Sequence, residues 1–103
     1  MTLFDLKEIL EQTNLPVAYH HYEDAPVLPY IVYLFDNSDN FCADDIVYEK
    51  INNYRVELYS NKKDIEAESM LETVLDDAFL YYDKYEEFIK EEDLYMVVYE
   101  LQM

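Results

Sequence analysis

The spacing of hydrophobic residues predicts two helices. The first helix has apolar residues on one face: Leu3, Leu6, Ile9 and Leu10. Thr2 and Asp5 are placed as a capping box at its start, and Asn14 with Pro16 ends it. The second helix follows Asp64 as N-cap and repeats apolar residues at the same spacing: Ala67, Met70, Leu71, Val74, Leu75 and Ala78.

Short apolar runs between and after these helices predict strands. Val17 to Tyr22 is a short strand and Glu23 to Pro29 a link, because Pro26 and Pro29 withhold backbone donors. Tyr30 to Phe35, "YIVYLF", is apolar on both faces, which is typical of a central strand.

Polar residues then predict interruptions. "DNSDN", Asp36 to Asn40, is predicted to be a turn, and Phe41 to Lys50 a short irregular strand or an extended loop. Asn52-Asn53 is predicted to break the chain again before a regular strand, Tyr54 to Tyr59.

The C-terminal part is predicted to be a hairpin. Its strands run from Tyr81 to Ile89 and from Leu94 to Leu101, with a turn around Glu91 to Asp93. The last strand is again apolar on both faces.

With 103 residues the chain is expected to form one domain, residues 1–103. The order helix, two or three strands, helix and hairpin predicts an α+β fold, a mainly antiparallel sheet with both helices on one face. Two short helices cover one side of such a sheet, so the Tyr-rich side left over is expected to meet another copy or a partner.

Composition and charge exclude several kinds of site and partner. Gly is absent, so turns fall to Asn, Asp, Ser or Pro, and glycine-rich phosphate loops are excluded. The formal net charge is -17, which disfavours direct binding to the DNA backbone or to anionic membranes. The lone Cys42 forms no internal disulfide, the first ten residues lack a basic signal region, and no apolar run is long enough for a membrane helix. We therefore expect a cytosolic protein, or one assembled in the cytosol.

Candidate metal sites are weak. On a strand His20 and His21 point to opposite faces, so only His21 with Glu23 can share an ion. "DNSDNFCADDIV" begins like a calcium loop but has Phe41 in place of the turning Gly and Val47 in place of the bidentate Glu. We expect no metal and no cofactor.

No nucleophile, acid/base pair or glycine motif stands out, so we do not expect an enzyme; a metal-dependent enzyme using His21 and Glu23 is the weakest hypothesis. The segment from Asp64 to Asp93 holds half of the acidic residues. It is either a solvated surface or an imitation of DNA phosphates that inhibits a nucleic-acid-handling enzyme. Lys62 and Lys63 are expected to be solvated at a strand-to-helix corner, or to meet acidic surface on a neighbouring subunit.

Several strings resemble one family. They are "LPVAY", "PYIVYLFDNSDNFCADDIVY", "INNYRVELYSNKKD" and "LYMVVYELQM". Together they resemble the small tail-completion, or tail-terminator, proteins of long-tailed phages and prophages of Gram-positive bacteria.

The resemblance implies an α+β subunit that forms a ring, typically a hexamer, on the head-proximal end of the tail tube. Such a ring caps the tube protein and joins the head connector protein, so the expected location is the virion tail, assembled in the host cytoplasm. The family implies no catalytic residues. For interfaces we predict the loop from Phe41 to Tyr48 and the aromatic hairpin, with these residues: Phe41, Asp44, Asp45, Tyr48, Tyr81, Tyr82, Tyr85 and Tyr95.

Overall fold

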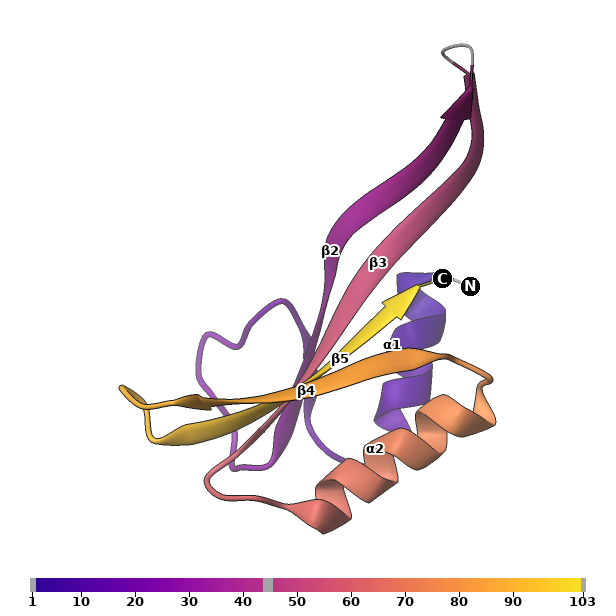
Figure 1. The fold of residues 1–103 in the computed structure, drawn as a ribbon. Helices are drawn as coiled ribbons and strands as arrows, with labels where there is room; N and C mark the ends of the chain where they lie inside the picture. Colours follow the sequence, from indigo (N-terminus) through magenta and orange to yellow (C-terminus); the bar gives the residue numbers. More distant parts are fainter. Residues whose placement is uncertain (1, 44–45, 103) are drawn as a thin grey trace.

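The computed structural model describes the backbone of residues 2–43 and 46–102, and the side chains of residues 2–38 and 51–102. The elements in chain order are α1 (Leu3–Glu11), β1 (Val17–Tyr19), β2 (Tyr30–Ala43), β3 (Ile46–Ser60), α2 (Ile65–Asp77), β4 (Tyr82–Ile89) and β5 (Leu94–Gln102). The strands form one sheet in the order β1-β2-β3-β5-β4 (Figure 1). Among the strand pairs of the described residues, β1–β2 is parallel and the other three are antiparallel, so the predicted α+β fold with a mainly antiparallel sheet is confirmed.

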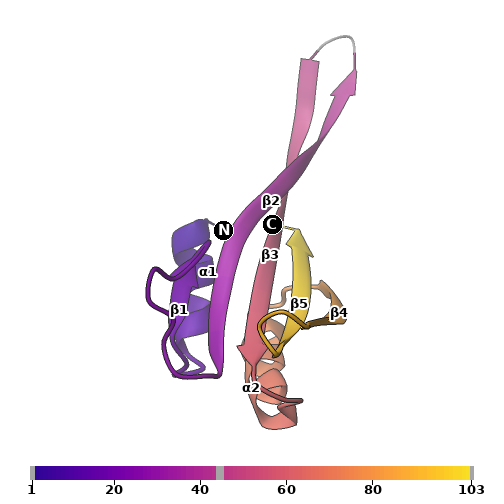
Figure 2. The ribbon, with the colours of Figure 1, turned by 90° about the vertical axis from the view of Figure 1, so that its left-hand side faces the viewer.

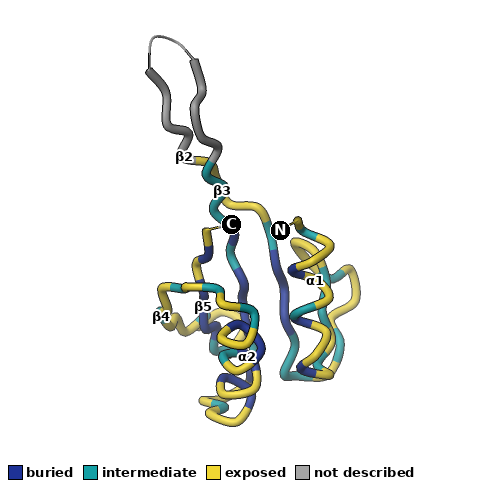
Figure 3. Tube along the Cα trace, turned by 90° about the vertical axis from the view of Figure 1, so that its right-hand side faces the viewer, coloured by how far each residue is buried: buried dark blue, intermediate teal, exposed yellow. Residues whose placement is uncertain are grey.

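Both helices pack on the same face of the sheet, as predicted. The core joins Leu6 and Leu10 of α1 to Leu71 and Leu75 of α2 over the alternate residues of the central strands. Those strand residues are Ile31 and Tyr33 of β2, Tyr54, Val56 and Leu58 of β3, and Val97, Tyr99 and Leu101 of β5. Figure 3 shows the buried stretches of the strands level with the two helices.

Both predicted helix caps are present. The Asp5 amide donates to Thr2 Oγ1 at 3.3 Å and the Thr2 amide donates to Asp5 Oδ2 at 2.8 Å, which completes the capping box. At α2 the Ala67 amide donates to Asp64 Oδ1 at 3.0 Å. Each cap supplies acceptors for helix N–H groups that lack a partner within the helix.

The predicted turn at Asp36 to Asn40 and the predicted break at Asn52-Asn53 are both wrong. β2 runs through the first and β3 through the second, and the two strands stay paired from Tyr30↔Tyr59 to Ala43↔Ile46. Register shifts between Phe35 and Asn37 and between Phe41 and Cys42 accommodate the irregular sequence. Alternation fails as a signal here because a two-stranded segment beyond the core has no side that must be apolar.

The side of the sheet without helices is covered more than the sequence suggested. β1 and β2 are parallel neighbours, so the chain must cross between them, and residues 20–29 make this crossing over the helix-free side. There Tyr22 packs edge-on against Tyr30, with ring centroids 5.2 Å apart. Val32, Met96 and Val98 on this side are buried within the single chain. The expectation that this side is a broad surplus apolar surface is therefore wrong at its centre.

Within the described backbone, four residues other than glycine adopt positive φ: Asn14, His20, Phe79 and Asp93. Asn and Asp tolerate this geometry, but Phe79 and His20 were not expected there. Phe79 ends α2 in a Schellman arrangement, in which the Leu80 amide donates to the Leu75 carbonyl at 3.0 Å and the Phe79 amide to the Asp76 carbonyl at 3.0 Å. Its side chain is 95% exposed, so packing does not offset the backbone strain.

Candidate functional site

The most distinctive feature of the molecule is a two-stranded ribbon, residues 36–43 of β2 and 46–53 of β3. β1 pairs with β2 only from Ile31 to Tyr33, and β5 pairs with β3 only as far as Asn53. Beyond these points the two strands pair only with each other and leave the body of the molecule (Figures 1 and 2). The chain measures 49 × 31 × 24 Å along its principal axes, which fits an elongated shape.

Polar and aromatic contacts define the base of the ribbon. The Asn53 side-chain amide donates to Asn37 Oδ1 at 2.7 Å and joins the two strands next to the register shift. One residue pair earlier, Phe35 and Tyr54 meet edge to face with ring centroids 5.8 Å apart. The ribbon therefore begins where core packing ends.

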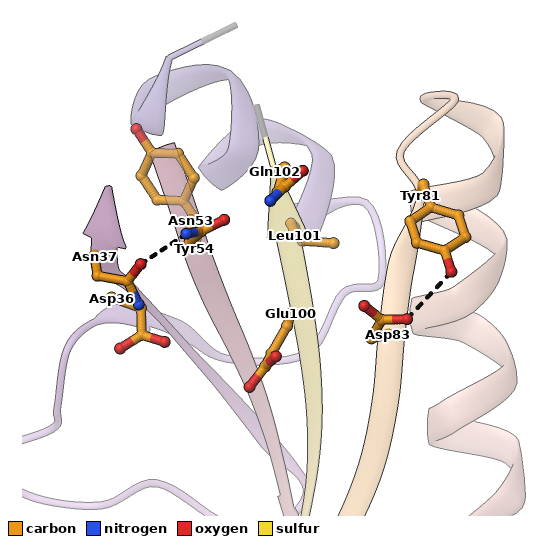
Figure 4. Close-up of a pocket in the computed structure, with 9 residues that line it drawn as sticks. All are labelled: Asp36, Asn37, Asn53, Tyr54, Tyr81, Asp83, Glu100, Leu101 and Gln102. Carbon is orange, nitrogen blue, oxygen red and sulfur yellow. Dashed lines mark hydrogen bonds between the residues drawn. The ribbon is translucent and has the colours of Figure 1, made fainter. Parts of the chain in front are cut away.

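A concavity of about 340 Å³ lies beside this base (Figure 4). It is lined by residues from four strands and the β4 approach: Asp36, Asn37, Asn53, Tyr54, Tyr81, Asp83, Glu100, Leu101 and Gln102. Its chemistry is that of hydrogen-bond acceptors, with three carboxylates and several amide groups. Such a surface suits binding of a partner that donates hydrogen bonds.

Tyr81 is the predicted interface residue at this concavity. Its side chain is 79% exposed, and its hydroxyl donates to Asp83 Oδ1 at 3.2 Å. This hydrogen bond to a carboxylate raises the pKa of Tyr81, so the phenol stays neutral at pH 7. Tyr81 is available for contact with another molecule.

Tyr82, Tyr85 and Tyr95 are partly buried in their own chain. Tyr82 packs on Tyr99 with ring centroids 5.2 Å apart, and Tyr95 packs on Phe88 at 4.9 Å. The Arg55 guanidinium lies 6.0 Å from the centre of the Tyr85 ring, within reach of a cation–π contact. These three rings contribute to the subunit's own packing. The structure brings them to the β4–β5 hairpin, as predicted, and Tyr81 lies just before it.

The other predicted interface residues lie in the ribbon. Asp44 and Asp45 lie outside the described residues. Phe41 pairs by backbone with Glu49 inside the ribbon, and Tyr48 lies in β3, but their side chains lie outside the described set. The segment from Phe41 to Lys50, predicted as a short irregular strand or an extended loop, thus belongs to a strand pair, and its role as an interface stays a prediction.

Lys63 is exposed at the corner before α2, as predicted, and its ammonium group is also paired within its own chain. Its Nζ lies 2.9 Å from Glu68 Oε2 and 3.1 Å from Glu86 Oε1. Lys84 extends the network, with Nζ 2.8 Å from Glu68 Oε1 and 2.9 Å from Glu72 Oε2. The network ties α2 to β4, which no short-range sequence signal could show because Lys63 and Glu86 are far apart in the chain.

The electrostatics of this network favour charged carboxylates. Burial alone would raise the pKa of Glu68 and Glu72, but hydrogen bonds from the lysines outweigh it and hold both pKa values below their ordinary range. The Tyr99 hydroxyl also donates to Glu72 Oε2 at 2.8 Å. Burial and this bond raise the pKa of Tyr99 far above its usual value.

The two histidines are arranged differently from the prediction. β1 ends at Tyr19 and His20 adopts φ 69°, so the rings do not diverge as they would on a strand. Their Nδ1 atoms lie 3.2 Å apart. Within the described side chains, no three His, Cys, Asp or Glu residues gather as they would around a metal ion.

Comparison with known proteins assigns no family to this chain. Neither a protein-family model nor a curated protein sequence matches the chain. The resemblance to tail-terminator proteins therefore stays a prediction. In the described part of the chain, no helix is long and apolar enough to span a bilayer.

Proposed function

We propose that this protein is a virion structural protein that self-associates into a ring and completes a phage tail. In this role it caps the tail tube and joins the tube to the head connector. The ribbon carries the proposal, and the resemblance described above gives it a specific form. The mechanism is steric: each subunit binds its neighbours in the ring, and the ring covers the end of the tail tube.

The ribbon supports self-association because a two-stranded hairpin alone is marginally stable in water. Apart from the Asn53–Gln102 pair at its base, no third strand pairs with it within the described backbone. By sequence, its paired segments near the connection are mostly apolar: Phe41, Cys42, Ala43, Ile46, Val47 and Tyr48. Such a segment gains stability when it packs on another surface, and a neighbouring subunit supplies one in a ring.

Charge opposes association and makes it dependent on salt. Copies with a net charge of -17 repel each other, and the repulsion is screened over about 10 Å at 0.1 M ionic strength. We therefore expect assembly to strengthen as salt increases. This dependence is opposite to that of a contact made by ion pairs.

The test is native mass spectrometry together with light scattering at several salt concentrations. The matched variant replaces residues 38–52 with Asn-Gly, because Asn37 pairs with Asn53 and a two-residue turn closes such a pair. All residues of the core cluster lie outside the deletion, so the variant is expected to keep its far-UV spectrum and its cooperative unfolding. Val27→Ser, at an exposed residue of the β1–β2 connection, serves as the control.

We expect a discrete oligomer for the parent chain and for Val27→Ser, and a monomer for the shortened chain. A parent chain that is monomeric at every salt concentration would contradict the proposal. If that monomer also inhibits a purified nuclease or polymerase in a manner abolished by high salt, the acidic DNA-mimic function replaces it.

A further inference from the structure

A second concavity lies on the helix-free side of the sheet, away from the ribbon. It has a volume of about 180 Å³ and is bounded by the β1–β2 connection and the β4–β5 turn, which lie on the same side of the molecule in Figure 1. Its lining includes Tyr22, Tyr30, Tyr59, Glu92 and the pair His20 and His21. The volume is several times the roughly 30 Å³ that one water occupies, so the space admits a side-chain head group.

The walls are aromatic. Tyr22 meets Tyr30 at an interplanar angle of 76° with ring centroids 5.2 Å apart. Tyr30 stacks on Tyr59 at 5.1 Å and 24°. Aromatic rings beside a carboxylate form a site that attracts organic cations, because ring faces carry negative potential.

One residue of this wall has a polar atom without a partner. The Tyr22 hydroxyl is buried and makes no hydrogen bond to any described residue. The Tyr59 hydroxyl, in contrast, already donates to Glu57 Oε1 at 2.9 Å. An unpaired buried hydroxyl is costly, so a bound group that hydrogen-bonds to it is favoured.

The charge of the site selects a cation. Glu92 is exposed, and its carboxylate forms no ion pair with a described residue. Burial raises the pKa of Tyr22 and of Tyr30, and the Glu92 charge adds to the effect at Tyr30, so both phenols stay neutral. An anion is repelled here, and an apolar group leaves the Tyr22 hydroxyl unpaired. A planar cation with several N–H donors can stack on the rings, donate a hydrogen bond to the hydroxyl and pair with the carboxylate at the same time.

We propose that this concavity binds the guanidinium of an arginine presented by a partner protein. The partner is a different protein, because the only arginine of this chain is Arg55, which is held in its own subunit 2.7 Å from Glu57. The inference does not rest on the ribbon or on ring formation. Its failure leaves the proposed function unchanged, since the two are measured by different experiments.

The test uses the full chain, with tyrosine rings labelled for NMR, titrated with N-acetyl-argininamide. N-acetyl-citrullinamide is the neutral isostere. The variants are Glu92→Gln and Tyr22→Phe, and Glu91→Gln in the same turn is the matched control because Glu91 does not line the concavity. Unchanged spectra elsewhere in each variant show that the fold is kept.

We expect saturable shifts of the Tyr22, Tyr30 and Tyr59 rings with a Kd of about 1–10 mM, a value in the range for one small head group. Glu92→Gln and Tyr22→Phe should each weaken binding about fivefold, which corresponds to loss of one hydrogen bond or exposed charge pair. Glu91→Gln should bind like the parent. Absence of saturation, equal binding of the citrulline compound, or full binding by Glu92→Gln would each overturn the proposal.

Discussion

Replacing Glu68 with Gln tests the ion-pair network between α2 and β4. The Glu68 residue is only 4% exposed, and two ammonium groups lie 2.8 and 2.9 Å from its oxygens. Gln keeps the shape of the side chain but removes its charge. Because Lys63 and Lys84 are partly exposed and retain Glu86 and Glu72, neither lysine is left as an isolated buried charge.

The expected cost follows from these contacts. Breaking a fully buried ion pair costs about 3–5 kcal/mol. Here the lysines reach water and keep second partners, so the cost is smaller. We expect Glu68→Gln to lower the free energy of unfolding by about 2 kcal/mol at pH 7. This is close to the loss of two charge-assisted hydrogen bonds that amide contacts partly replace. With a urea m-value of about 1 kcal/mol per M for a chain of this size, the midpoint should fall by about 2 M.

The pH dependence gives an independent check. The pKa of Glu68 is lower in the folded state than its ordinary value of 4.5, so the folded chain binds fewer protons than the unfolded chain between the two values. Its contribution is therefore fully present above about pH 4.5 and is lost as the pH falls through the folded pKa. The difference between parent and Glu68→Gln should shrink at acid pH.

The assay is urea unfolding followed by circular dichroism at pH 7 and at acid pH. Glu91→Gln in the exposed β4–β5 turn is the control and should stay within about 0.5 kcal/mol of the parent. A Glu68→Gln variant as stable as the parent at pH 7 would refute the reasoning. A stability difference that does not change with pH would do so as well.

Three further substitutions have clear expected outcomes. Phe79→Gly relieves the strain of the left-handed backbone conformation at the end of α2 and should raise the free energy of unfolding by about 1 kcal/mol. Calorimetry should show this as a rise in Tm of about 5 °C, and an unchanged or lower Tm would contradict the assigned strain. Tyr22→Phe removes a buried hydroxyl without a partner and should raise the free energy of unfolding by about 1 kcal/mol in urea titrations, whereas a loss of stability would mean that the hydroxyl is satisfied. Asp64→Ala removes the N-cap of α2 and should cost about 1 kcal/mol in the same titrations, against no change for Lys62→Ala beside it.

Much of the fold could be predicted from local patterns. Thr2 with Asp5, and Asp64 ahead of α2, marked both helix starts because capping depends on residues a few positions apart. The central strands followed from apolar runs whose side chains fill the core. The β4–β5 hairpin followed in the same way, from two runs separated by a polar turn.

What the sequence could not show depends on long-range pairing. The ribbon's strands contain Asp36, Ser38 and Asn52, which are typical of turns, and only the backbone pairing of β2 with β3 places them in strands. The parallel β1–β2 pair leaves no local signal either, although it sends residues 20–29 across the helix-free side. That crossing produces the aromatic concavity, so the candidate arginine site could not be found before the topology was known.

The length of the ribbon can change without changing the packing of the core. Beyond Asn37 and Asn53 neither strand is paired with the rest of the sheet, so the core places no limit on how many residues the ribbon contains. Adding one residue to each strand extends it by about 3.3 Å and leaves the core contacts unchanged, whereas adding a residue to one strand alone creates a further bulge. In the proposed ring, the distance over which a subunit reaches its neighbour would thus be adjustable, and insertions in pairs would fit the same body to assemblies of different spacing.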